Sequence, residues 1–222
     1  YGDRLATRLG QEFELLDVGY KPYPACQLHR GIIRGSIALR AEANLAAPKS
    51  LVISMHPYEA NFVGVSYLGP FSGFPQTFMS APFCAALAWA RGVVSFAGMH
   101  EFHAPDVMTI LQRIRVVPDS TRPSYGPRLV AELLDGKTIA WEDTEGARGY
   151  ILDRENAARM AHALCAEVHV SRSMVEGLEN ASRNIYEHGG VESLISQVCQ
   201  AVNVALSSNA SPEQCRTLEC RQ

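Results

Sequence analysis

The segment from Lys21 to Arg30, KPYPACQLHR, gathers side chains that could bind an organic acid. Its two prolines stiffen the chain just before a stretch with helical periodicity. The first turn of a helix leaves backbone N–H groups without partners and carries partial positive charge, which favours a carboxylate. Lys21, His29 and Arg30 add an ammonium, an imidazole and a guanidinium, so the segment predicts a binding site for a polycarboxylic acid. The alternative is a proline-rich turn with a surface lysine and a capping histidine.

Three residues of this segment are candidate catalytic groups. His29 is the best general acid or base, because an unperturbed imidazole titrates near neutral pH. Cys26 is a second candidate, since a helix N-terminus favours the reactive thiolate, although a buried structural thiol is the commoner case. Lys21 and Arg30 are candidate cations for negative charge that develops on a bound acid.

The composition excludes several other classes of protein. The chain has 222 residues, enough for one large or two small domains. The formal net charge is -3, and the basic stretch Arg113–Arg128 is diluted by Pro and Ser, so we expect no nucleic-acid partner. The longest apolar run, Ala81–Ala90, is shorter than the roughly 20 residues of a membrane span, so we expect no membrane partner.

The six cysteines include no CxxC pair, which argues against a zinc site or a thioredoxin-like motif. Reduced thiols favour a cytoplasmic location, with the mitochondrial matrix as the alternative in a eukaryote. Cys215 and Cys220 in the polar tail could pair without strain. The N-terminus has neither Met nor an apolar signal core and opens in mid-pattern, from which we expect a processed or truncated chain.

Periodicity predicts an α+β domain over residues 10–148. Helices are expected over Ala25–Asn44, Thr77–Trp89 and Asp106–Ile114. Strands are expected over Glu12–Val18, Leu51–Met55, Val63–Leu68, Arg115–Val117, Arg128–Leu134 and Thr138–Glu142, with a hairpin turn at Asp135-Gly136. Asp143, with Glu142 and Glu145, is expected to form a solvated acidic edge.

Helices alone are expected over residues 149–206, and a flexible tail over 207–222. The expected helices are Asp153–Val168, with Asp153 as N-cap, then Met174–Glu187 and Val191–Ala205. Upstream of them, His100 and His103 flank Glu101 in HEFH. Two histidines without further nearby ligands are weak evidence for a metal, so we interpret HEFH as a surface loop.

The order of these motifs resembles the MmgE/PrpD family, which includes 2-methylcitrate dehydratase, cis-aconitate decarboxylase and iminodisuccinate epimerase. KPYPAC, followed by a histidine and an Ile/Ala-rich helix, is similar to the family signature. The blocks LVISMHP, SAPFCAALAWARG, RIRVVPD and ELLDGKT follow in the family's order. The similarity extends over Glu12–Val198, and the order and spacing of the blocks are its specific feature.

This resemblance implies a two-domain architecture in which the chain supplies the α+β domain and the last helices of an all-α domain. The active site would lie between the domains, so the N-terminal half of the same protein, or a companion chain, would complete it. The resemblance also implies a homodimer that uses no metal and no organic cofactor.

The resemblance assigns candidate substrate-binding positions as well. Gln27 stands where many members have arginine, and Phe83 replaces a family tyrosine whose hydroxyl faces the site. Tyr23 belongs to the signature itself. Lys21 matches the family lysine at the active-site edge, and Cys26 matches a histidine of cis-aconitate decarboxylases or a cysteine of many bacterial members.

The family histidine falls one residue after His29, where this chain has Arg30. A shift of one residue rotates a helical side chain by about 100°, so we expect His29 and Arg30 to have exchanged roles.

The activity implied is that of a cofactor-free lyase acting on a citrate-like di- or tricarboxylic acid by dehydration or decarboxylation. Dehydration needs a base for a proton next to a carboxylate, an acid for the departing hydroxyl and cations for the enolate-like charge. The altered Gln27 and Phe83 indicate a substrate other than 2-methylcitrate, or a different outcome. An isomerase or epimerase on the same scaffold, and a non-catalytic relative whose site has drifted, are the alternatives.

Overall fold

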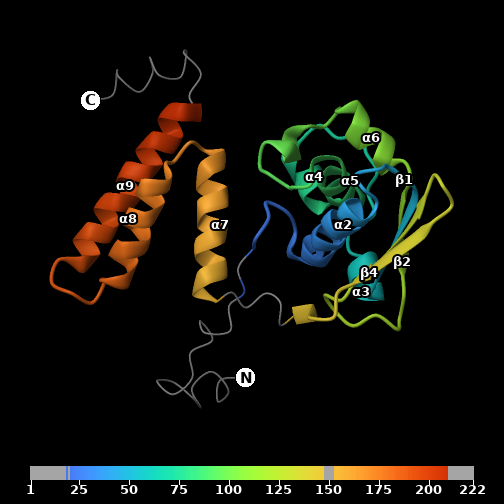
Figure 1. Cartoon of the computed structure of the whole chain (residues 1–222), viewed down its shortest axis with the longest axis horizontal. Coiled ribbons are helices and arrows are strands. Elements are labelled where there is room, and N and C mark those ends of the chain that lie inside the picture. The colour runs from blue at the N-terminus through green and yellow to red at the C-terminus, as the bar shows by residue number, and fades with distance from the viewer. Residues whose placement is uncertain (1–18, 20, 148–152, 210–222) are drawn as a thin grey trace. The chain divides into compact units, whose positions relative to one another are not determined.

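A computed structural model describes residues 19, 21–147 and 153–209 (Figure 1). The chain divides into two compact units, Tyr1–Leu152 and Asp153–Gln222. The first unit is mixed α/β, and the second is built from helices. The strand expected over Glu12–Val18 and the tail from residue 210 onward lie outside the described residues.

A four-stranded mixed sheet forms the frame of the first unit. Its strands lie in the order β2-β1-β3-β4, with β1 parallel to β2 and antiparallel to β3, and with β3 and β4 forming a hairpin. The four are β1 (Pro48–Met55), β2 (Ile114–Pro118), β3 (Arg128–Leu133) and β4 (Thr138–Glu142), which confirms four of the expected strands. Gly136 takes a φ of +86° in the expected hairpin turn, a conformation that glycine adopts at no steric cost.

The strand expected over Val63–Leu68 is wrong. The segment folds into successive turns, in which Val65 N donates to Phe62 O and Tyr67 N donates to Gly64 O. Gly64 has a φ of +89°, which no extended strand allows. Val65 alone is fully buried, whereas Val63 is 87% exposed, so the alternation of apolar residues marks one anchored turn instead of a strand.

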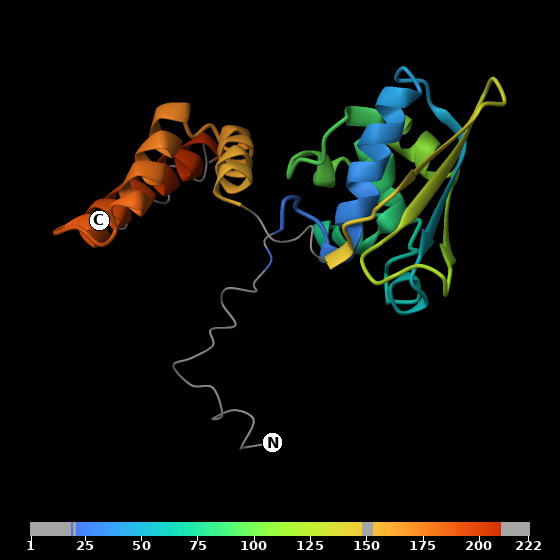
Figure 2. The same cartoon turned by 60° about the horizontal axis from the view of Figure 1, so that its bottom comes forward.

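The helices of the first unit gather on one side of the sheet (Figure 2). Helix α2 (Arg30–Glu42) packs against α5 and against β3 and β4, and α5 (Ala81–Arg91) also packs against α6 and β2. The shorter elements are η2 (Gln27–His29), α3 (Pro57–Ala60), α4 (Phe74–Met79), η3 (Gly98–His100) and α6 (Pro105–Leu111). No helix in the described part of the chain combines the length and the apolar character that a membrane span requires.

The helix expected over Thr77–Trp89 is divided in two at Ser80. Pro82 lies in the first turn of α5, where it cannot donate the backbone hydrogen bond that would continue α4. Ser80 takes an extended conformation, and its Oγ accepts a hydrogen bond from Phe83 N at 3.1 Å. The serine therefore caps α5, and the carbonyls at the end of α4 are left for other partners.

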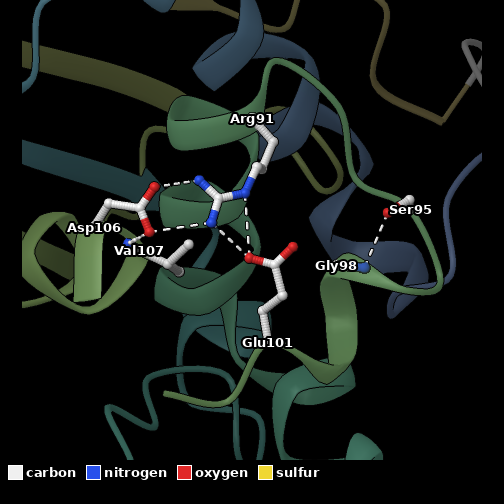
Figure 3. A network of polar contacts seen from close by, with 6 residues as sticks. All are labelled: Arg91, Ser95, Gly98, Glu101, Asp106 and Val107. Carbon is white, nitrogen blue, oxygen red and sulfur yellow. Dashed lines mark hydrogen bonds and ion pairs between the residues drawn. The ribbon is translucent and has the colours of Figure 1, made fainter. Parts of the chain in front are cut away.

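Arg91 fastens the end of α5 to the two segments that follow it (Figure 3). Its guanidinium binds Glu101, with Nη2 2.6 Å from Oε2, and also binds the carboxylate of Asp106 in the first turn of α6. The hydrogen bond from Arg91 is the main reason that the pKa of Asp106 lies below its usual value. Between these anchors, Gly98 N donates to Ser95 Oγ at 2.9 Å. Glu101 of the HEFH segment thus belongs to an ion-pair network.

The second unit contains α7 (Arg154–Glu167), α8 (Arg172–Arg183) and α9 (Gly190–Asn209), in agreement with the helices expected there. Asp153 is the N-cap of α7, as predicted, and its Oδ1 accepts a hydrogen bond from Asn156 N at 2.7 Å. Helix α8 packs against α7 and α9. A small core forms around Val170, Val175 and Ala201.

We expect Gly35→Ala to lower the free energy of unfolding of the first unit by about 1–3 kcal/mol, although alanine favours a helix more than glycine does. A Cβ on Gly35 would lie 2.4 Å from Cε3 of Trp141. Urea unfolding followed by tryptophan fluorescence measures this unit alone, because Trp89 and Trp141 both lie in it.

Gly177→Ala in α8 is the matched control. A Cβ there would meet only the end of the Gln197 side chain, at 2.8 Å, and that group can move aside. We expect this variant to stabilise the second unit by about 0.5–1 kcal/mol, measured by far-UV circular dichroism. Unchanged or raised stability of Gly35→Ala would contradict the tight contact between α2 and the sheet.

Candidate functional site

The turn Lys21–Cys26 is tied to α4 by its backbone. Ala25 N donates to Tyr23 O at 2.8 Å within the turn, and Cys26 N donates to Phe78 O at 3.0 Å. Phe78 O is free to accept because the residue four positions later, Pro82, has no N–H to donate. The helix expected just after the two prolines is confirmed, although its first turn is the 3-10 helix η2 and α2 starts at Arg30.

His29 is fully buried where η2 passes into α2. Its Nε2 lies 2.9 Å from Met79 O at the end of α4, and its Nδ1 has no hydrogen-bond partner among the described residues. Burial lowers the pKa of His29 to about 4, and the hydrogen bond to Met79 O opposes that shift. The imidazole is therefore neutral at neutral pH, and because a carbonyl only accepts, the hydrogen lies on Nε2 and the lone pair on Nδ1.

Cys26 and Cys84 are free thiols in different environments. Cys84 is fully buried, with Sγ 3.6 Å from Thr77 O. Burial is the main reason that the pKa of its thiol is raised, and the nearby Cys26 raises it further. Such a thiol stays protonated and inert. Cys26 is only half-buried, so it is the accessible thiol of the two.

Lys21, Tyr23 and Gln27 lie around this turn. Lys21 is exposed, and its Nζ stands 4.9 Å from the centroid of the Phe78 ring, a cation–π contact. Tyr23 and Gln27 are half-buried. Burial raises the pKa of Tyr23, while the charges of Arg34 and Arg30 act to lower it, so the phenol lies in the field of both arginines.

Phe83, the remaining predicted substrate-binding residue, lies in the core. It is fully buried on α5, and its ring centroid is 4.9 Å from that of Phe71. Its contacts are those of a packing residue.

Arg30 and Arg34 lie one helical turn apart and bind the same carboxylate oxygen. Oε2 of Glu145 is 3.3 Å from Nη2 of Arg30 and 2.6 Å from Nη1 of Arg34. The Arg30 side chain is 9% exposed, that of Arg34 37% and that of Glu145 52%. The hydrogen bond and charge of Arg34, assisted by Arg30, lower the pKa of Glu145. We call Arg30 and Arg34 the arginine pair, and this pair holds the anionic carboxylate of Glu145.

Asp143 fixes the segment that carries Glu145. Its Oδ1 accepts hydrogen bonds from Glu145 N at 2.9 Å and Gly146 N at 3.0 Å, and its own N donates to Pro127 O at 3.0 Å. Asp143 is 3% exposed, so the expectation of a solvated acidic edge is wrong for this residue. Its carboxylate lies against Gly31 in the first turn of α2, where a Cβ would be 2.8 Å from Oδ2 and where partial positive charge stabilises an anion.

Sequence reasoning did not single out Arg34 and Glu145 as site residues. Two arginines at i and i+4 on one helix share a face, and this spacing was the available signal for Arg34. Nothing local links Glu145 to them, because 111 positions separate it from Arg34.

The histidines of HEFH are not part of a metal site within the described residues. His100 stacks on Phe74, and its Nδ1 lies 2.8 Å from Phe96 O. Among residues 19, 21–147 and 153–209, no three His, Cys, Asp or Glu side chains lie close enough together to hold a metal ion.

No protein-family model matches the chain, and no curated protein matches it significantly in sequence. A proposal of function therefore rests on the order of its motifs and on the geometry of the arginine pair.

Acidification is expected to destabilise the first unit through His29. The unfolded imidazole binds a proton below about pH 6.5, whereas the folded one does so only below about pH 4. The stability that depends on a neutral, buried His29 is therefore fully present above pH 6.5 and is lost as the pH falls toward 4. His29→Gln should remove a pH-dependent loss of about 3 kcal/mol from urea unfolding curves. The exposed His103→Gln is the control, and equal pH slopes for the wild type and His29→Gln would contradict the burial of a neutral imidazole.

Proposed function

We propose that the chain is the C-terminal part of a cofactor-free lyase that acts on a citrate-like di- or tricarboxylic acid. The observation that carries the proposal is that Arg30 and Arg34, directly after the KPYPAC turn, hold one carboxylate between them. Hydrogen bonds between guanidinium and carboxylate groups are short and strong, and arginine suits such recognition better than lysine. The resemblance of the motif order to the MmgE/PrpD family supports the same class of substrate.

In this proposal the arginine pair binds one carboxylate of the substrate and Lys21 binds a second. Lys21 suits that role because its ammonium is exposed and makes its described contact with the Phe78 ring, not with a carboxylate. Tyr23 and Gln27, which are half-buried beside the turn, contribute polar groups to the same ligand.

In a dehydration, a base removes the proton from the carbon next to a carboxylate. The electron pair of that C–H bond forms a C=C bond while the C–O bond breaks, and the departing hydroxide takes up a proton to leave as water. Cys26 is the accessible candidate for proton transfer. His29 is assigned to positioning, because it is neutral, buried and bonded to Met79 O. The remaining acid and base groups would come from the N-terminal segment.

The need for that segment is part of the proposal. Val191, Ile195, Val198 and Val202 recur every three or four residues along α9, and each is about half exposed. This spacing is typical of a helix that packs against another helix, so it supports an all-α domain completed by the N-terminal half. The MmgE/PrpD-like architecture, a homodimer and a cytoplasmic location belong to the same proposal and rest on the resemblance.

A non-catalytic relative is the second candidate. The burial of His29 and Phe83 favours it, because neither side chain reaches a ligand from the core. The two candidates differ in turnover, whereas both allow an acid to bind at the arginine pair.

The test is turnover of 2-methylcitrate, citrate and cis-aconitate by the native assembly, followed by NMR. We expect Lys21→Ala to lower kcat/KM by about 100-fold or more, as the loss of a charge-stabilising group does. Lys49→Ala should leave it unchanged, because Lys49 is an exposed lysine paired with Glu132 on the sheet.

Absence of turnover by the wild-type assembly would contradict the lyase and favour the non-catalytic relative. Exchange of a substrate C–H proton with D2O, without net loss of water or CO2, would instead indicate an isomerase or epimerase.

A further inference from the structure

Glu145 occupies the arginine pair that the proposed function assigns to the substrate. Its Oε2 accepts hydrogen bonds from both guanidinium groups, at 3.3 Å from Arg30 and 2.6 Å from Arg34. A substrate carboxylate bound by the same donors would have to take the place of this oxygen. Glu145 therefore competes with any acid that binds there.

The Glu145 side chain can leave the pair without unfolding its surroundings. It is 52% exposed, and its shorter ion pair, with the 37% exposed Arg34, is of the solvent-exposed kind that contributes little to stability. Its backbone stays in place, because Asp143 accepts the N–H groups of Glu145 and Gly146. Release is thus a rotation of one side chain about a fixed backbone.

The helix that carries the arginine pair keeps its position when Glu145 leaves. Arg30 is held at the buried start of α2, and Gly31 and Gly35 bring that helix into contact with Pro127 and Trp141. Guanidinium groups remain charged throughout the physiological pH range. An anion arriving from solvent therefore meets two cations on one fixed helix.

The competition discriminates between ligands. A tethered group acts at a high effective concentration, of the order of millimolar for short linkers, so a monocarboxylate offers the arginines no more than Glu145 already does. A ligand with a second carboxylate gains a further contact, and we assign that contact to Lys21, the exposed ammonium of the same motif.

We infer that Glu145 is an internal competitor that makes the arginine pair select acids with at least two carboxylates. This inference rests on the proposed function for the identity of the site, but it concerns binding and does not require turnover.

Isothermal titration calorimetry of the full chain with citrate and with acetate tests it. We expect Glu145→Gln and Glu145→Ala to bind citrate at least about tenfold more tightly than the wild type does. Acetate binding should become measurable in these variants. Glu142→Gln is the matched control, because Glu142 is a similarly exposed carboxylate paired with Arg122, at 2.7 Å, and not with the arginine pair.

Arg34→Gln in the Glu145→Gln background should abolish the gain. Tryptophan fluorescence during urea unfolding establishes that each variant is folded. Unchanged or absent citrate binding by folded Glu145→Gln, or a gain that survives Arg34→Gln, overturns the inference.

The outcomes separate this inference from the lyase. Tighter citrate binding by Glu145→Gln without turnover of any acid by the native assembly supports the competitor and rejects the lyase. Turnover with an unchanged dissociation constant for citrate in Glu145→Gln rejects the competitor and leaves the lyase standing.

Discussion

The close approach of α2 to the β3–β4 hairpin is the constraint on which the site depends. Gly31 and Gly35 lie one turn apart, and a Cβ on either would collide with Pro127 or Trp141 at less than 3.0 Å. Arg30 and Arg34 each precede one of these glycines, so they occupy the neighbouring face of the helix in the same register. Because Gly31 and Gly35 allow α2 to lie directly against the hairpin, both guanidinium groups reach the segment that follows β4. That segment carries Glu145.

The other end of the motif depends on the interruption between α4 and α5. In a continuous helix, Phe78 O and Met79 O would accept bonds from residues 82 and 83. Pro82 has no N–H, and the N–H of Phe83 goes to Ser80 Oγ, so both carbonyls need other donors. Cys26 N and His29 Nε2 supply them. The position of the KPYPAC turn thus depends on the break between α4 and α5, which leaves these two carbonyls without donors from their own helix.

Local patterns predicted the parts of the fold that local physics decides. The prolines before α2, the Asp135-Gly136 turn and the Asp153 cap act within a few residues, and all three were found where the sequence indicated. One error arose where a distant partner decides. Val63–Leu68 alternates like a strand but is held as a turn by the bond from Ala81 N to Val65 O. The other error was local, because Ser80 and Pro82 divide the helix expected over Thr77–Trp89 from within.

The sequence indicated cations of the candidate site, but it did not indicate the carboxylates that they bind. A helix start rich in basic residues indicated Arg30. The burial of Asp143 and the position of Glu145 follow instead from the packing of their segment against α2, more than 100 positions away in the chain. His29 shows the same limit. Its type and position suggested an acid or base near neutrality, but tertiary packing lowers its pKa to about 4.

The neutral state of His29 has a consequence for how the site holds an anion. An imidazole that titrated near pH 6.5 would add a charge that varies within the physiological range. Burial removes that variation, so the positive charge that holds Glu145 comes from Arg30 and Arg34, whose guanidinium groups do not lose their protons in this range. Glu145 stays ionised over the same range, because the arginine pair lowers its pKa. The charges that the protein contributes to the exchange of Glu145 for an external carboxylate are therefore constant over this range, and the number and spacing of carboxylates on the ligand decide the exchange.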